Sequence, residues 1–259
     1  MVRLLAVLVS AVLCVGIVVT MRFMASVANQ LNDLRDEVGK RFADVTEATR
    51  LFGQVERLRG DAVPRLAAYA TEVDSVGPDI LRQFAYEETD RLAAHLQALT
   101  QLGAECPGEN HDWLLTLTRC ARKGIDAVST TVDDDFWNTE PAARYLGAQG
   151  EAIAERLINV RRLFIVKRHE DLAALAPICT EQRQMGIQVR TAVLEELRPI
   201  LQRGLMIDFI VFDGALSYQV HLDRLGETSA TTINADAQQV EHFVRRFDLL
   251  WNAADPADL

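Results

Sequence analysis

The 259-residue chain is short of positive charge and of cysteine. Its 37 Asp and Glu residues outnumber its 27 Lys and Arg residues, so the formal net charge is −10 at pH 7. A general nucleic-acid binder needs a basic surface that displaces counterions, so we expect no nucleic acid as a partner. One of the four cysteines, Cys14, lies in an apolar run. The remaining three are a poor disulfide framework and favour a reducing compartment, although a Cys106–Cys120 bridge stays open.

The motifs of common cofactor and metal sites are also missing. No Gly-x-Gly-x-x-Gly follows a predicted strand, and no Gly-x-x-x-x-Gly-Lys occurs. There is no Cys-x-x-Cys and no His/Cys pairing at zinc spacing. The acidic run 133–135 is interpreted as a solvated loop, because a hard-cation site needs ligands from several directions. We therefore expect no cofactor and no metal.

The longest apolar run, residues 4–21, contains no charged side chain and lies between Arg3 and Arg22. Its length is near the lower limit for a helix that spans a membrane. A cleaved signal peptide is the alternative, but its apolar core is normally shorter, so we favour a single-pass anchor over residues 1–22. The basic residues after the run, like the cysteine pattern, favour a cytoplasmic location for the rest of the chain.

The region 23–110 is predicted to be a helical stalk. Its first apolar side chains recur at alternating spacings of three and four, as in a coiled coil, at Met24, Val27, Leu31, Leu34 and Val38. An ordinary amphipathic helix that packs on the rest of the chain fits the same pattern. A coiled coil would make the protein a homodimer. A further helix is predicted over 80–102, and Gly103, Pro107 and Gly108 suggest a domain boundary at 103–110.

Strands and helices alternate in the third region, 111–259, which is predicted to be one α/β domain. Strands are expected at 125–131, 160–167, 187–193, in two halves of 205–223, and at 231–234. Helices are expected after Asn110 and Thr139, and over 170–185, 195–202 and 236–251. Helical crossovers imply parallel strands early in the order, whereas Asp213-Gly214 is typical of a late hairpin. The fold class is thus α/β, with a mixed sheet flanked by helices.

Several short segments stand out within this order: Ala127-Val128-Ser129, Phe136-Trp137, Tyr145-Leu146, Arg161-Arg162-Leu163-Phe164-Ile165, Gln182 with Gly186-Ile187-Gln188-Val189-Arg190, Asp208 through Gly214, and Phe247 through Trp251. Together with the order of elements, they resemble the phospholipase D-like superfamily, and more narrowly the single-copy domains of that type in actinobacterial proteins. The resemblance covers residues 111–259 and implies a phospholipase D-like sheet.

Active members of that superfamily carry His-x-Lys-x-x-x-x-Asp, in which the imidazole attacks phosphorus and the ammonium stabilises the phosphoryl oxygens. If Asp213 matches the motif's Asp, the His position falls on Met206 and the Lys position on Asp208. A thioether cannot act as that nucleophile, and a carboxylate repels phosphate. The resemblance therefore implies a domain that does not hydrolyse phosphodiesters by the family route.

Five residues are candidates for ligand binding: Arg161, Arg162, Asp208, Asp213 and His221. The two arginines lie on a strand with basic ends and could meet an anion, although pairing with the abundant carboxylates is the simpler interpretation. His221, Asp208 and Asp213 are also weak candidates for an unorthodox catalytic site, because an imidazole near a carboxylate can act as a base. A hairpin histidine on a polar face is the simpler interpretation of His221, and we favour it.

Together these observations predict a membrane-anchored, non-catalytic sensor or scaffold whose degenerate domain binds a small-molecule ligand or a partner protein. Superfamily enzymes build one site from two copies of the domain, so a single copy again favours a homodimer. The alternative is a phosphodiesterase or nuclease with a non-standard active site. A structural membrane protein whose partner binds the stalk is a third interpretation.

Overall fold

The computed structural model describes residues 21–22, 24, 62–130, 134–202, 208–223 and 228–256, and the chain divides into two compact units, Met1–Glu88 and Thr89–Leu259. The predicted anchor at 4–21 lies outside the described residues, apart from Met21 at its end. Of the repeating apolar positions from Met24 to Val38, only Met24 is described. Within the described part of the chain, no helix is long and apolar enough to cross a membrane.

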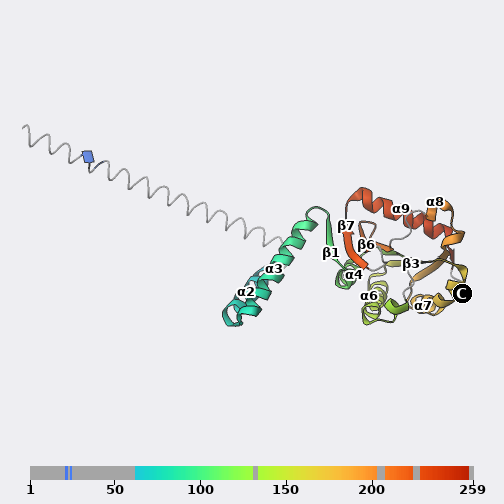
Figure 1. Cartoon of the computed structure of the whole chain (residues 1–259), viewed down its shortest axis with the longest axis horizontal. Helices are drawn as coiled ribbons and strands as arrows, with labels where there is room; N and C mark the ends of the chain where they lie inside the picture. Colours follow the sequence, from blue (N-terminus) through green and yellow to red (C-terminus); the bar gives the residue numbers. More distant parts are fainter. Residues whose placement is uncertain are drawn as a thin grey trace, which may run out of the picture. The chain divides into compact units, whose positions relative to one another are not determined.

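Two helices occupy the part of the stalk region that the structure describes (Figure 1): α2 (Ala62–Val76) and α3 (Asp79–Leu99). Gly77-Pro78 separates them, as expected of two residues that disfavour a continuous helix. Neither helix contains a buried residue, and Leu66, Ile80 and Phe84 are among their exposed apolar side chains. Packing within the two helices therefore leaves apolar surface uncovered.

The second unit is built on one eight-stranded sheet of order β1-β7-β6-β5-β2-β3-β4-β8. The strands are β1 (Gly103–Pro107), β2 (Gly124–Ser129), β3 (Asn159–Val166), β4 (Gln188–Val193), β5 (Asp208–Phe212), β6 (Leu216–Leu222), β7 (Thr228–Asn234) and β8 (Asp255–Pro256). β2, β3 and β4 are parallel neighbours, and every other pair is antiparallel. The predicted mixed sheet, parallel first and hairpin-connected later, is confirmed.

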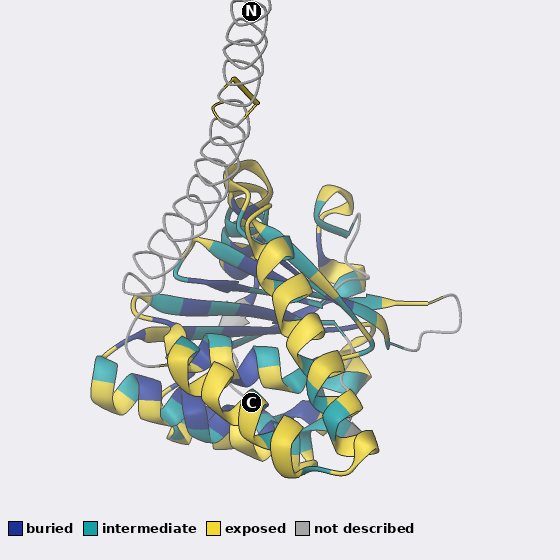
Figure 2. Ribbon diagram, turned by 90° about the vertical axis from the view of Figure 1, so that its left-hand side faces the viewer, coloured by how far each residue is buried: buried dark blue, intermediate teal, exposed yellow. Residues whose placement is uncertain are grey.

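Helices cover both faces of this sheet (Figure 1). The longer ones are α4 (His111–Cys120), α6 (Glu140–Arg156), α7 (Leu172–Gln184) and α9 (Ala237–Ala253), and the short ones are α5 (Asp134–Trp137), α8 (Pro199–Gln202) and the 3-10 turns η1 (His169–Asp171) and η2 (Leu194–Glu196). One apolar cluster unites side chains of α4, α6 and α7 with the sheet, and a second unites those of α9 with it. The strands accordingly carry more of the buried residues than the helices do (Figure 2).

Local sequence signals set several element ends. Asn110, Thr139 and Asp236 cap α4, α6 and α9, each through a side-chain oxygen that accepts a backbone N–H. The predicted Asp213-Gly214 hairpin is confirmed: both residues have positive φ, 56° and 65°, and Phe212 O accepts from Ala215 N. Such a turn requires residues that tolerate the left-handed region, which Asp and Gly do.

Three features differ from the sequence-based prediction. Gly103–Pro107, expected near a domain boundary, is the edge strand β1, and the compact units instead divide between Glu88 and Thr89. Cys106 and Cys120 are free thiols, so the bridge left open between them is not formed. The helical piece at 195–202 is two short turns, η2 and α8, because Pro199 disfavours helix at the residue before it.

Candidate functional site: a cavity at the end of the parallel strands

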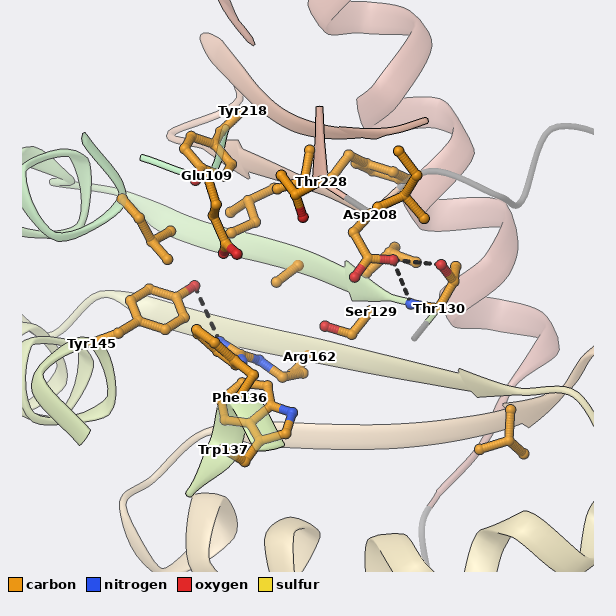
Figure 3. A pocket seen from close by; sticks show the side chains of 18 of the residues that line it. Glu109, Ser129, Thr130, Phe136, Trp137, Tyr145, Arg162, Asp208, Tyr218 and Thr228 are labelled. Atoms are coloured by element: carbon orange, nitrogen blue, oxygen red, sulfur yellow. Dashed lines mark hydrogen bonds between the residues drawn. The ribbon is translucent and has the colours of Figure 1, made fainter. Parts of the chain in front are cut away.

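A cavity of about 640 Å³ opens on the sheet face that carries α4, α6 and α7. Its walls come from the carboxyl ends of β2 and β3, from the start of β5 and from β6. Open α/β sheets bind their ligands at the carboxyl ends of parallel strands, because the loops that follow those strands surround a crevice there. Figure 3 shows side chains from several elements that converge on this space.

Arg162 forms part of the cavity wall and is 1% exposed. Its Nη2 donates to the Tyr145 hydroxyl at 3.1 Å and to Gln149 Oε1 at 3.0 Å. Its guanidinium also stacks on Trp137 and Tyr145, with Cζ 4.9 and 5.1 Å from the two ring centroids. All of these partners are neutral. Burial raises the pKa of the Tyr145 phenol more than the nearby guanidinium lowers it, so Tyr145 does not neutralise the arginine.

The charge of Arg162 has no nearby counter-charge within the described residues. None of their carboxylates lies within 4.0 Å of the guanidinium, and its Nε is buried without an acceptor. Nη1 likewise donates to none of them. An arginine is charged at any physiological pH, and burying a charge without compensation is costly. This side chain is therefore the most unusual feature of the site.

Aromatic rings form the wall next to Arg162. Phe136 and Trp137 meet edge to face, with centroids 5.0 Å apart, and Trp137 in turn meets Phe164 edge to face at 5.7 Å. Tyr218 lines the cavity from β6, and burial raises the pKa of its hydroxyl. In the sequence, Phe136-Trp137 and Tyr145 stand out only through the family resemblance. Their role as a wall depends on long-range contacts and could not be predicted from the sequence.

A polar group lies at the other side of the cavity, at the start of β5 (Figure 3). Asp208 Oδ1 accepts from the backbone N of Thr130 at 2.6 Å and from the Thr130 hydroxyl. Ser129 and Thr228 also line this side. Glu109 lines the cavity near the start of α4, and its carboxylate lies 3.2 Å from Nε2 of His111. Carboxylates thus lie on two sides of a space whose described lining contains one buried cation, Arg162.

The structure separates the five residues that the sequence offered as ligand-binding candidates. Arg162 and Asp208 line the cavity, whereas Arg161, Asp213 and His221 do not. Met206, matched above to the catalytic histidine, lies outside the described residues. Glu109, Ser129, Thr130 and Tyr218 were not predicted from the sequence as site residues. Ser129 and Thr130 lie at the end of a predicted strand, and Ser129 also belongs to a segment that carries the family resemblance.

Arg161 lies on the α9 side of the sheet, where carboxylates hold it. Its Nε and Nη2 contact the two Asp126 oxygens at 2.7 and 2.9 Å, and Nη2 lies 3.4 Å from Asp248 Oδ1. The guanidinium also stacks on Phe247, with Cζ 4.7 Å from the ring centroid. The hydrogen bond to Asp126 raises the pKa of Arg161 more than burial lowers it. The simpler interpretation, pairing with carboxylates, describes this arginine.

Asp213 fastens the β5–β6 turn to the beginning of β2. Its carboxylate accepts from the backbone N of Arg122, Lys123 and Gly124 at 2.7–3.1 Å, and its own N donates to Gly124 O. Burial alone raises the pKa of Asp213, but the three backbone donors outweigh it and leave the pKa below its usual value. Asp213 therefore has a structural role, and the groups that it contacts lie away from the cavity.

His221 lies on the face of β6 opposite Val220 and Leu222, which line the cavity. Its Nε2 lies 2.8 Å from the hydroxyl of Thr232 on β7, the next strand. Neither histidine nor cysteine is among the described residues that line the cavity. Within the same part of the chain, no three His, Cys, Asp or Glu side chains are grouped to hold a metal ion.

Part of this chain matches a known protein family. Residues 133–258 match a domain of unknown function, DUF6879. No curated protein matches. The archaeal chromatin protein TrmBL2 has a similar structure at 12% identity and a TM-score of 0.41, over 69% of this chain and 70% of that one. The phospholipase D family member Nuc of Salmonella typhimurium is similar at 14% identity and a TM-score of 0.39, over 59% of this chain and 97% of that one. NucT of Helicobacter pylori is similar at 8% identity and a TM-score of 0.38, over 60% of this chain and 98% of that one.

Proposed function

We propose that the unit Thr89–Leu259 is a sensor domain that binds a small molecule in the cavity and does not transform it. The cavity itself supports this function best. Its volume of about 640 Å³ lies within the range that drug-sized ligands occupy, roughly 300–1,000 Å³. Aromatic and aliphatic side chains with a few polar groups between them line it, which is the usual composition of a small-molecule site.

Two observations support binding without catalysis. The alignment with the phospholipase D-like motif places sulfur and a carboxylate, Met206 and Asp208, where that chemistry needs an imidazole and an ammonium group. The described lining of the cavity also offers hydroxyls and carboxylates but no imidazole or thiol. His221, the histidine that the sequence offered as a substitute base, contacts Thr232 on the other face.

The proposal includes a membrane-anchored homodimer. Residues 4–21 supply the apolar span, and the repeating apolar positions from Met24 to Val38 supply a pairing surface. The uncovered apolar side chains of α2 and α3 are a further reason to expect a partner helix, because amphipathic helices gain most of their stability by burying that face. Ligand binding in one unit would then be reported through the paired helices.

The test is a thermal-shift screen of the full chain in a mild detergent, with a library of neutral and charged aromatic fragments. Ligands that bind only the folded state raise its melting temperature. The variant Ser129→Leu narrows the cavity, and Gln219→Leu introduces the same side chain on β6 away from the cavity lining. We expect hits whose shifts disappear in Ser129→Leu and persist in Gln219→Leu. A screen without hits, or hits insensitive to Ser129→Leu, contradicts the proposal.

The alternative, a phosphodiesterase or nuclease, is tested on the same preparation. We expect no hydrolysis of bis(4-nitrophenyl) phosphate and no cleavage of single- or double-stranded DNA. Turnover that disappears in His221→Ala or Asp208→Asn would replace the sensor proposal with the enzymatic one.

A further inference from the structure

We propose that the ligand of the cavity is a monoanion with a flat aromatic body, an aromatic carboxylic acid, and that Arg162 binds its carboxylate. This inference rests on the proposed function and specifies its ligand class. Two adjacent arginines differ in the charge of their partners. Arg161 has two carboxylate partners, whereas Arg162, at 1% exposure, has only neutral partners among the described residues.

A bound anion would supply the counter-charge that Arg162 lacks among the described residues. Nη2 is occupied by Tyr145 and Gln149, and Nε is buried, whereas Nη1 has no acceptor within the described part of the chain. The ring contacts with Trp137 and Tyr145 and the two hydrogen bonds hold the guanidinium in one orientation. A preorganised cation loses little further side-chain entropy when it binds, so an anion at Nη1 gains a charge-assisted hydrogen bond.

The charge of the described lining favours an anion with a single negative charge. Among the described residues, three carboxylates line the cavity, Glu109, Asp171 and Asp208, against two cations, Arg162 and Lys167. Asp171 already accepts from the backbone N of Arg168, and Glu109 lies beside His111. These carboxylates repel a phosphate monoester, which is close to a dianion at neutral pH, more strongly than they repel a carboxylate.

The walls define the rest of the ligand. Phe136, Trp137 and Tyr145 lie around the guanidinium and present ring faces and edges, on which an aromatic body packs. The strand register places Arg162 beside Ala127, and Asp208 two residues further along and one strand beyond. At the usual strand spacing and rise, the Cα atoms of Arg162 and Asp208 are about 12 Å apart. A fused-ring acid fits between these two ends.

Three probes with one ring system separate the contributions: 2-naphthoate as the monoanion, 2-naphthamide as its neutral isostere and 2-naphthyl phosphate as the dianion. Their affinities for the full chain in detergent are measured by isothermal titration calorimetry. We expect millimolar or tighter binding of 2-naphthoate, as a ligand of this size allows. It should bind at least tenfold more tightly than the amide or the phosphate, since a hydrogen bond to a charged group is worth about one factor of ten or more.

The variant Arg162→Met removes the cation and keeps an apolar chain of similar length, and Arg161→Met makes the same charge change on the other face. Arg162→Met should lose at least tenfold in 2-naphthoate affinity and much less in 2-naphthamide affinity, whereas Arg161→Met should bind both probes as the parent does. Melting temperatures establish that each variant is folded. The comparison of acid and amide in the parent protein requires no variant and stands if Arg162→Met does not fold.

The results distinguish this inference from the function on which it rests. Equal or tighter binding of 2-naphthamide, equal or tighter binding of the phosphate, or no binding of 2-naphthoate at millimolar concentration overturns the ligand class. The sensor proposal survives those results as long as neutral fragments still bind in a manner that Ser129→Leu abolishes. It falls if no fragment binds or if the binding is insensitive to Ser129→Leu.

Discussion

Arg161 and Arg162 are neighbours on β3 but lie on opposite faces of the sheet, and only Arg161 is neutralised. Asp126 on the adjacent strand and Asp248 on α9 hold Arg161, while the Arg162 guanidinium contacts Tyr145, Gln149 and Trp137. Because side chains alternate along a strand, one residue of displacement in register would exchange the two environments. The two arginines should therefore respond differently to substitution.

We expect Asp126→Asn to lower the free energy of unfolding by about 1–3 kcal/mol, because it leaves the half-buried Arg161 without its closest carboxylate. Chemical denaturation at neutral pH measures this loss. In the double variant Asp126→Asn/Arg161→Met the cost of the first substitution should shrink. Full additivity of the two losses would contradict a direct coupling between these side chains. Fragment binding in the cavity should remain unchanged throughout.

Asp213→Asn should make stability less dependent on pH. The pKa of Asp213 is lower in the folded protein than in the unfolded chain, so its stabilisation is present above the ordinary carboxyl pKa and is lost as the pH falls through the folded value. At pH 7 we expect a loss of about 1 kcal/mol, from weaker hydrogen bonds to three backbone N–H groups. The parent and Asp213→Asn should converge in stability in denaturation series carried down to acidic pH.

Gly214→Ala is the matched control for that series. Its φ of +65° disfavours a side chain, although no atom lies within 4 Å of the added Cβ. We expect a loss of about 1 kcal/mol from backbone strain, with no change in the pH dependence. A pH-dependent effect of Gly214→Ala, or a constant effect of Asp213→Asn, would show that the carboxylate is not the source of the acid sensitivity.

His221→Ala should leave fragment binding unchanged, because His221 contacts Thr232 and does not line the cavity. Loss of one cross-strand hydrogen bond lowers the free energy of unfolding by about 0.5–1.5 kcal/mol. Thr232→Val removes the same bond from the other strand and should cost a similar amount. A tenfold change in affinity for any cavity ligand in His221→Ala would place this histidine in the binding site after all.

The full chain in detergent should have the mass of a dimer by light scattering corrected for bound detergent. The substitutions Leu31→Asp and Leu34→Asp, on the repeating apolar positions, should shift it to a monomer, because charges at those positions oppose pairing. The matched pair Asn29→Asp and Asp33→Asn changes charge between those positions and should leave the dimer intact. A parent protein that is monomeric at micromolar concentration contradicts the pairing proposal.

Much of the sheet could be predicted because local signals and long-range packing agree. Val160–Lys167 is rich in β-branched and apolar residues, and the Asp213-Gly214 turn specifies its own hairpin. β1 could not be predicted, because its sequence, Gly-Ala-Glu-Cys-Pro, has weak strand preference. It forms only because β7 offers partners, from Gly103↔Asn234 to Pro107↔Ala230. Its strand conformation is fixed by contacts more than a hundred residues away in sequence.

The cavity was less predictable than the fold, because it depends on side-chain direction. The sequence drew attention to Arg161 and Arg162 as a basic pair, and only the register between β2 and β3 decides which one meets the cavity. Glu109 and Tyr218 enter the site from segments that no local motif links to Arg162. Asp208 was identified because a family motif marked its position, and its contact with Thr130 required the β2–β5 pairing.

Asp208 at the start of β5 and Asp213 in the turn after it hold β2 at both of its ends. Asp213 holds the amides of Arg122 through Gly124, and Asp208 holds the amide of Thr130 beside the cavity. A molecule that enters the cavity can compete for the hydrogen bond between Asp208 and Thr130, but it has no access to the hydrogen bonds of Asp213. In hydrogen–deuterium exchange, the amide of Gly124 should thus exchange slowly in every state. The exchange rate of the Thr130 amide should instead change when a ligand occupies the cavity.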